Sequence, residues 1–446
     1  MEYSDIEIKT PIGPILLPTN ELYDFITRVN ADTKKEAGLK HQHIFDFFDP
    51  VIPDNEFFLL SPKKVSAYMK CIWDILHRDY DILQIKEYGG KGQYEIPVTY
   101  KEFDVDKENQ ESIPINATIF VKDNKSGEKS VFSFLPFSDG EGHHIEIEVF
   151  FDSSKTNFRQ IWDNIDDYFK TEGPLKGEKF DTNWKYIDYQ ERDWDSIVLN
   201  EETYKLVNRN IINFIDNMEE YKKIRLPTSR GVLITGPPGT GKTLCCETIM
   251  SLVDCTIIYV TSDTVESVGD IKEIYKLARK LSPTIIVIED IDTLGGLDRR
   301  DKGSHPLLGE FLNCLNGVGI NDGVITIATT NYPENLDNAL ADRPGRFDLR
   351  INFDLPNSEL REHILEKYLS EVTEEKLELS SLIRKTDGLS GAYLREIVIT
   401  AYMISLEQGT TINQDILEQG VDAVLDLKEN IRETYGTIKL EEGLYS

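Results

Sequence analysis

The sequence has 446 residues, which is enough for about three domains, and 40% of them are hydrophobic, as packed cores require. Its formal net charge of −30 repels phosphate backbones, so a nucleic-acid partner is disfavoured. No apolar run reaches the roughly 18 residues of a membrane span, and the N-terminal stretch MEYSDIEIKT is acidic rather than basic and then apolar. We therefore expect a cytoplasmic protein without a membrane segment.

Residues 1–172 mix helical and strand patterns. The spacing of apolar residues predicts helices over 20–35, 61–80 and 157–170. Short β-rich runs between turn residues predict strands in INATIFVKD, SVFSFLPF and HIEIEVFF. This pattern indicates an α+β domain, which we expect to be a recognition domain. The polar segment 173–194 follows, contains glycine and proline, and is predicted to be a linker.

The pattern changes from Trp194 onward. Apolar strands now alternate with helical patterns of about ten to fifteen residues, which indicates βαβ units and a parallel sheet. After Pro356 only helical patterns remain. We therefore expect an α/β fold in which an αβα parallel-sheet subdomain, 195–356, precedes a helical lid with a C-terminal tail, 357–446.

A phosphate-binding motif follows the first strand pattern of this region. The strand GVLIT runs into GPPGTGKT, and helical sequence follows at once. In the spacing G-x-x-x-x-G-K-T, glycines let backbone amides turn inward around a phosphate. Lys242 is then placed to reach the β and γ phosphates, and the Thr243 hydroxyl to bind magnesium. A Gly/Pro-rich turn would explain the glycines but not the Lys–Thr pair. The predicted nucleotide-binding residues here are Gly236, Pro237, Pro238, Gly239, Thr240, Gly241, Lys242 and Thr243.

A later strand pattern, TIIVIEDIDTL, ends in two carboxylates. Its apolar residues 285–288 run directly into Glu289 and Asp290, which is how a buried parallel strand delivers acids to a metal site. The usual order of the two acids is Asp and then Glu. Either the acids have exchanged roles, or the strand only ends in solvated charge.

With these motifs the chain resembles the AAA family of ATPases, from residue 194 to about residue 427. The segment KEIYKLARKLSPTIIVIEDIDTL is similar to the family's Walker B motif with its preceding helix, and this match sets the register of the two acids. The resemblance implies that Glu289 holds magnesium, directly or through water, and that Asp290 polarises the attacking water. The reach of each side chain changes by about 1.5 Å, which retunes hydrolysis without abolishing it. The same Glu–Asp order occurs in a branch of the family that includes a mitochondrial inner-membrane translocase.

Two further stretches resemble the family's first sensor and its trans-acting arginines. VITIATTNYPENLD is an apolar strand pattern followed by Asn331, whose amide would hydrogen-bond the γ phosphate or the attacking water. The alternative is an asparagine that begins a turn. In LADRPGRFDLRINF, Arg343 and Arg346 would grip phosphate oxygens at a neighbouring subunit's site, which makes hydrolysis depend on assembly. The alternative is a surface pair of salt-bridging arginines.

The lid stretch TDGLSGAYLREIVITAYMISL predicts a helix capped by Ser390. Gly391 and Ala392 resemble the family's lid motif, in which small residues let the start of the helix approach the nucleotide. Arg395 is either a second sensor that reaches the γ phosphate or an exposed arginine of the first turn.

The resemblance fails at the loop that grips extended polypeptide in family members. Residues 261–275 are shorter than the family pattern and lack its aromatic residue, and only Val265 and Val268 are apolar near the expected tip. We therefore expect that this loop does not thread a peptide. The sequence also lacks H-E-x-x-H, so we expect no zinc protease site.

Together with the resemblance, these features predict a magnesium-dependent ATPase that assembles as a ring, which we expect to be a hexamer. We expect it to remodel or move a protein or protein complex selected by residues 1–172. An assembly or scaffold protein that is switched by nucleotide is an alternative, favoured by the exchanged acids and the short loop. A nucleic-acid motor is a third reading, supported by the fold alone.

Overall fold

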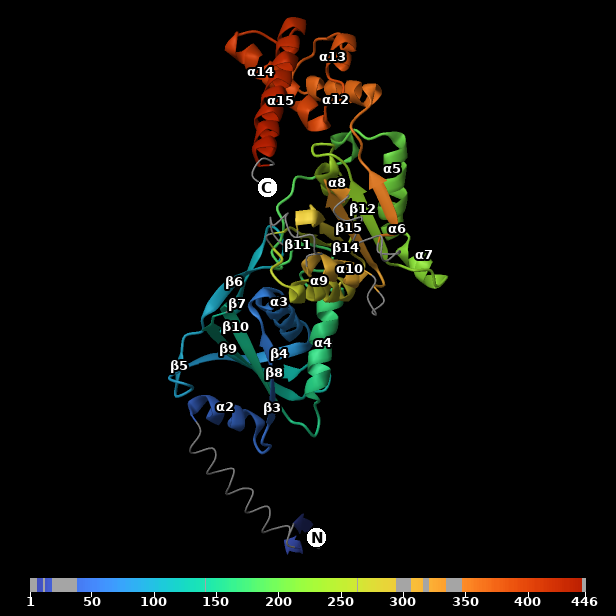
Figure 1. Cartoon of the computed structure of the whole chain (residues 1–446). Helices are drawn as coiled ribbons and strands as arrows, with labels where there is room; N and C mark the ends of the chain where they lie inside the picture. Colours follow the sequence, from blue (N-terminus) through green and yellow to red (C-terminus); the bar gives the residue numbers. More distant parts are fainter. Residues whose placement is uncertain are drawn as a thin grey trace. The chain divides into compact units, whose positions relative to one another are not determined.

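The computed structural model divides into two units, Met1–Lys176 and Gly177–Ser446, and Figure 1 labels most of their elements. Side chains are described between residues 38 and 430, within the ranges that follow. The structure describes residues 6–10, 13–17, 38–140, 142–262, 264–293, 306–315, 321–333 and 347–442.

The first unit contains two small hairpins and one larger sheet with its helices. The hairpins are β1 (Ile6–Thr10) with β2 (Gly13–Leu17), and β6 (Tyr100–Asp104) with β7 (Gln110–Pro114). The remaining elements are α2 (Leu39–Phe48), β3 (Asp54–Leu60), α3 (Pro62–Asp79), β4 (Tyr80–Gly89), β5 (Tyr94–Ile96), β8 (Thr118–Asp123), β9 (Lys129–Asp139), β10 (Gly142–Phe151) and α4 (Phe158–Thr171).

The larger sheet is antiparallel, with the strand order β3-β10-β9-β8-β4-β5. Side chains alternate across each strand, so the sheet has two faces. On one face Phe58 of β3 packs on Trp162 of α4, with 4.4 Å between the ring centroids. On the opposite face Val131 of β9 lies in a buried cluster with Ile44 of α2. Helices therefore pack on both faces.

The predicted α+β character of this unit is confirmed. Helices α3 and α4 begin and end within one residue of the predicted 61–80 and 157–170, and the three predicted strands are β8, β9 and β10. The predicted helix 20–35 lies outside the described residues. The sequence did not predict α2, which has only 10 residues, or β3, whose apolar side chains do not alternate with polar ones.

The second unit contains a six-stranded sheet in which every described pair of strands is parallel. Its strand order is β11-β13-β14-β15-β12-β16. Strand β14 is buried at every residue, as expected for a central strand between helical layers. The predicted αβα parallel sheet is confirmed. Its elements are β11 (Lys179–Asp181), α5 (Glu201–Val207), α6 (Asn213–Asp216), α7 (Met218–Lys223), β12 (Arg230–Thr235), α8 (Lys242–Leu252), β13 (Thr256–Val260), α9 (Val268–Lys280), β14 (Thr284–Ile288), α10 (Pro306–Leu315), β15 (Val324–Thr330) and β16 (Leu349–Asn352).

The segment that the sequence suggested as a linker, 173–194, lies mostly within the second unit. The division between the units follows Lys176, and β11 pairs in parallel with β13 as an edge strand. A strand of three residues in a polar segment has too few apolar positions to show a period, which is why the sequence alone pointed to a connection.

The last part of the unit is entirely helical, as predicted, with α12 (Ser358–Ser370), α13 (Ser380–Lys385), α14 (Gly391–Glu407) and α15 (Gln414–Glu442). Leu394 and Val398 of α14 lie in the core of this lid. Ser390 is the N-cap residue of α14, as predicted, but its side chain makes no capping hydrogen bond. None of the helices in the described ranges has the length and apolar character needed to cross a membrane.

Candidate active site

The phosphate-binding loop joins β12 to α8 at the carboxyl ends of the parallel strands. Gly236 and Gly239 have φ angles of 152° and 75°, which side chains rarely tolerate. A side chain at Gly236 would also collide with the backbone carbonyl of Phe353, and one at Gly239 would meet Ala392 of the lid at 2.8 Å. Both glycines are therefore required by the backbone conformation and by the close packing around it.

Lys242 turns back into this loop. Its Nζ donates to the carbonyl oxygens of Gly236 at 2.8 Å and Pro237 at 2.9 Å, and to Asn331 Oδ1 at 2.7 Å. The residue is only 6% exposed. Burial lowers the pKa of Lys242, and the nearby carboxylate of Asp290 opposes that shift. The ammonium is thus held in the loop by groups that phosphate oxygens could replace.

Asn331 connects Lys242 to the acidic residues. Its Nδ2 donates to Asp290 Oδ1 at 3.0 Å, while its Oδ1 accepts from Lys242. Strand β15 lies between β12 and β14 in the sheet. Asn331, which follows β15, therefore lies between the loop that follows β12 and the acids that follow β14. The structure therefore joins three predicted site residues in one hydrogen-bonded chain.

Glu289 follows β14 directly and has the environment of a ligand-binding acid. Its Oε1 is buried and has no hydrogen-bond partner among the described residues. A buried carboxylate oxygen without a partner is costly, and carboxylate oxygens are preferred ligands of Mg²⁺. Thr243 is exposed in the first turn of α8. The oxygen atoms of these two side chains are of the kind that magnesium prefers, and their assignment to the metal stays a prediction.

Asp290 has an unusual backbone and a perturbed side chain. Its φ of 44° is rare for any residue but glycine, and its N–H donates to Thr329 Oγ1 at 3.0 Å. Burial raises the pKa of Asp290, and the carboxylates of Asp292 and Glu289 raise it further, against the effect of Lys242. A carboxylate whose pKa is raised accepts a proton more readily, which suits a general base.

The family model described as "ATPase family associated with various cellular activities (AAA)" matches residues 232–355, the stretch that carries this site. The chain carries an AAA ATPase domain. An "ATP-dependent zinc metalloprotease FtsH 2" of Salinibacter ruber (strain M8) is 33% identical over 230 residues, which are 49% of this chain and 34% of that protein. A protein of Caenorhabditis elegans named "Probable 26S proteasome regulatory subunit 10B" is 34% identical over 218 residues, 45% of this chain and 53% of that protein. The chain thus spans about a third to a half of the length of these relatives.

Two residues of the AAA domain's site were missed by the sequence analysis. Asp292 accepts a hydrogen bond from Thr330 Oγ1 at 2.6 Å, next to Asn331. Tyr259 of β13 lies on the same face of the sheet as Glu289, and burial and a hydrogen bond to Glu289 raise the pKa of Tyr259. The third acid could have been found from the spacing E-D-x-D. Nothing in the sequence links Tyr259 to the site.

The lid of the AAA domain touches the phosphate-binding loop. The Ala392 N–H donates to the Gly239 carbonyl at 3.0 Å, so the small residues predicted to lie near the nucleotide do lie at this loop. Gly391 is also close, because a Cβ there would lie 3.4 Å from the Gly239 carbonyl oxygen. Arg395 is exposed, and its guanidinium carbon lies 6.0 Å from the ring centroid of Tyr368 in the lid.

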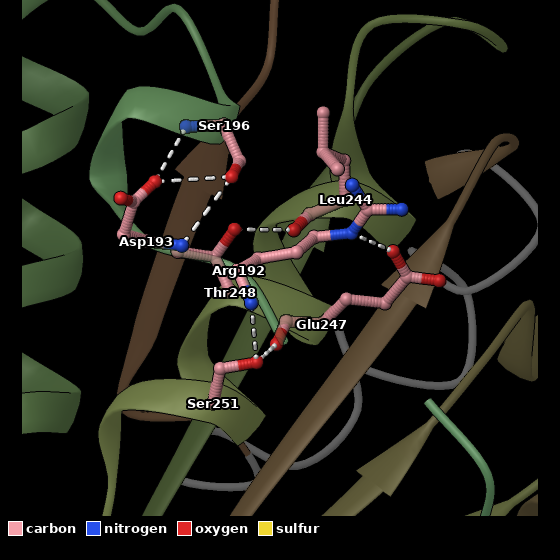
Figure 2. Close-up of polar contacts among 7 residues, drawn as sticks. All are labelled: Arg192, Asp193, Ser196, Leu244, Glu247, Thr248 and Ser251. Carbon is pink, nitrogen blue, oxygen red and sulfur yellow. Dashed lines mark hydrogen bonds and ion pairs between the residues drawn. The ribbon is translucent and has the colours of Figure 1, made fainter. Parts of the chain in front are cut away.

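A segment before α5 is fastened to α8, as Figure 2 shows. The Nε of Arg192 donates to Glu247 Oε2 at 2.7 Å, and its N–H donates to Ser251 Oγ at 3.0 Å. Further along the same segment, Lys367 of the lid donates to the carbonyl oxygen of Asp195 at 2.7 Å. The segment therefore contacts both the helix that begins with Lys242 and the lid.

The predicted arginines and the apolar tip of the shortened loop are not found at this site among the described residues. Arg343 and Arg346 lie outside the described residues. Val265, expected near the tip of the shortened loop, is buried with 4% exposure. The preceding residue is fastened as well, since Thr182 Oγ1 donates to the Thr264 carbonyl at 2.9 Å.

Proposed function

We propose that this protein hydrolyses ATP with magnesium, assembles as a hexameric ring in the cytoplasm, and remodels or moves a protein partner selected by residues 1–172. The observation that carries the proposal is the hydrogen-bonded chain Lys242–Asn331–Asp290 at the end of the parallel sheet. The unpartnered oxygen of Glu289 beside it supports a metal ion at the same edge.

The residues divide the chemistry among them. Backbone amides of the loop and Lys242 bind the phosphates of ATP. The oxygen of water attacks the γ phosphorus, the bond from that phosphorus to the β–γ bridging oxygen breaks, and Asp290 accepts the proton of the water. Asn331 orients the water or the γ phosphate. Bound magnesium supplies positive charge that offsets the phosphate oxygens, and Thr243 and Glu289 would hold it.

In an assembly, Arg343 and Arg346 of a neighbouring copy would complete the site by contacting the γ phosphate.

Helix α14 supports an interface between copies because it exposes three large apolar side chains. Tyr402, Met403 and Leu406 are 41%, 56% and 62% exposed. Exposed apolar residues that lie close together on one helix are typical of a binding surface.

A second candidate function is an assembly protein that is switched by nucleotide. The burial of Val265 favours it, since the loop then lacks an apolar tip that could grip a peptide. Turnover that rises with protein concentration alone would support this candidate. Stimulation by an unfolded protein supports the remodelling ATPase, and stimulation by DNA would support a nucleic-acid motor.

Substitutions at the two ends of the hydrogen-bonded chain test the reaction. Lys242→Ala should lose nucleotide affinity, whereas Asp290→Asn should bind ATP and stall hydrolysis, because only Lys242 contacts phosphate in the ground state. A fluorescent ATP analogue reports binding, and phosphate release reports turnover. Asp254→Asn is the matched control, since Asp254 is exposed at the opposite end of β13. Wild-type turnover in Asp290→Asn would show that Asp290 is not the base.

Glu289→Gln tests how the two acids divide their roles. It should raise the magnesium concentration at which turnover is half-maximal, because the amide is a weaker ligand than the carboxylate. If Glu289→Gln instead bound magnesium and ATP normally and stalled, Glu289 rather than Asp290 would be the base.

A further inference from the structure

In the part of the chain that the structure describes, one edge strand of the large sheet in the first unit is paired on one side only. Within the described residues, β3 pairs only with β10, over all 7 of its residues and without a shift of register. Its outer side therefore presents backbone N–H and C=O groups that another strand could pair with.

The opposite edge of the same sheet is protected, which makes the open edge of β3 distinctive. Strand β4 has an irregular register between Ile82 and Gln84, its end is covered by the short strand β5, and it carries Lys86. Bulges, short edge strands and lysines all discourage further pairing. The sequence of β3, DNEFFLL, contains neither lysine nor proline.

One face of the sheet beside this edge carries apolar side chains that are exposed or partly exposed. Phe57 and Leu59 of β3 point to the same face and are 61% and 52% exposed. The register places Leu135 of β9 on that face in line with Leu59, and Phe137 next to it is 42% exposed. We call Phe57, Leu59, Leu135 and Phe137 the β3 patch.

Carboxylates lie within the patch and on the opposite face of β3. Glu146 lies between Leu59 and Leu135 in the register, and Glu148 lies opposite Phe57. Glu148 has Lys40 at 3.5 Å, which also attracts Glu146, so two acids on this face share one lysine. The exposed Asp54 and Glu56 lie on β3 itself and point to the face opposite Phe57 and Leu59. A strand that pairs here would gain from basic side chains.

We infer that an extended segment of a partner protein pairs with β3 as an added strand, with apolar side chains over the β3 patch and basic side chains on the opposite face, beside Asp54 and Glu56. The inference rests on the proposed function and gives the chemistry of the segment that the first unit selects. A second copy of this chain fits less well, because it brings the same acidic strand and a net charge of −30. Strand addition supplies affinity through the backbone and specificity through alternate side chains.

The test uses the full-length protein and three labelled peptides of about ten residues, long enough to span β3. One alternates valine with lysine, one alternates valine with glutamate, and the third is the lysine peptide with alternate backbone nitrogens methylated. Fluorescence anisotropy should show binding of the unmodified lysine peptide alone. The methylated peptide keeps the charge but loses the backbone donors, so it separates strand pairing from general attraction to an acidic protein.

Matched variants locate the binding. Leu59→Lys should weaken binding of the lysine peptide roughly tenfold or more, because it places like charge in the edge. Ile224→Lys adds the same charge to a side chain that is 68% exposed in the second unit and should change nothing. Glu56→Gln should weaken binding roughly threefold to fivefold, as expected for loss of one cross-strand charge pair.

Three kinds of result would overturn the inference. The first is binding of the methylated or the glutamate peptide as tight as that of the lysine peptide. The second is an equal effect of Leu59→Lys and Ile224→Lys on binding. The third is a change in the mass of the assembly in Leu59→Lys without peptide, which would make the β3 patch a contact between copies. Basal ATP hydrolysis should be unchanged in Leu59→Lys, so failure of the inference is distinguishable from failure of the ATPase proposal at Asp290.

Discussion

Asp290 combines a strained backbone with a carboxyl group whose pKa is raised. Backbone strain at a non-glycine residue persists only where surrounding contacts maintain it, and here the Asp290 N–H is held by Thr329 and its side chain by Asn331. The like charges of Glu289 and Asp292 disfavour the ionised form of Asp290. The motif E-D-x-D therefore sets the protonation of the proposed base through its neighbours.

Asp292→Asn should move the acid limb of the pH profile of kcat/KM to lower pH. A neighbouring negative charge raises the pKa of Asp290, so its removal lowers that pKa, and the active, ionised form then persists in more acidic solution. The amide oxygen of the asparagine can still accept from Thr330. The control variant Asp254→Asn should leave the acid limb of the pH profile unchanged. An unmoved limb in Asp292→Asn would show that Asp290 is not the group that titrates.

At the scale of elements, the described part of the loop between β13 and α9 is fastened to the rest of the second unit and turns one apolar side chain inward. Ser267 and Asp270 form a reciprocal capping box at the start of α9, and Thr264 is hydrogen-bonded to Thr182. Between these fastened points Val265 is buried. The short loop thus positions an apolar side chain inward, where it contributes to stability.

Val265→Ala should destabilise the second unit by about 2 kcal/mol, because two buried methyl groups are lost and a cavity remains. Val268→Ala, at a partly exposed site, should cost less than about 1 kcal/mol. Heating while following the binding of a fluorescent nucleotide compares the two variants. An unchanged midpoint in Val265→Ala would argue that this side chain is available to a substrate after all.

For the whole molecule, activity is proposed to depend on neighbouring copies. Arg343 and Arg346 would act on a neighbour's nucleotide, and the exposed apolar side chains of α14 would help to hold the copies together. The first unit, with its own sheet and the β3 patch, would bind the partner protein. Hydrolysis, assembly and selection are thus assigned to different parts of the chain.

Arg343→Ala should leave ATP binding by an isolated subunit intact and reduce turnover by about three orders of magnitude or more. Mixing Arg343→Ala chains with Lys242→Ala chains should restore part of the activity, since some interfaces then pair an intact loop with an intact arginine. In the control, Lys242→Ala chains are mixed with chains that carry both substitutions, and no interface is complete. No recovery in verified mixed rings would count against action on a neighbour.

The sequence by itself determined the features that depend on short spacing. The loop from Gly236 to Thr243 is contiguous, so its motif predicts phosphate binding without knowledge of the fold. Helices α3 and α4 show a full helical period of apolar residues and were predicted nearly to the residue. The alternation of strands and helices likewise predicted the parallel sheet.

Only the tertiary structure decided which distant residues meet. Asn331 lies between Lys242 and Asp290 because β15 is inserted between β12 and β14, and strand order depends on crossover connections that no local pattern records. Tyr259 reaches Glu289, and β11 joins the sheet, for the same reason. Burial of Val265 and exposure of Phe57 were also invisible in the sequence, since an apolar side chain in a short element carries no sign of which face will be covered.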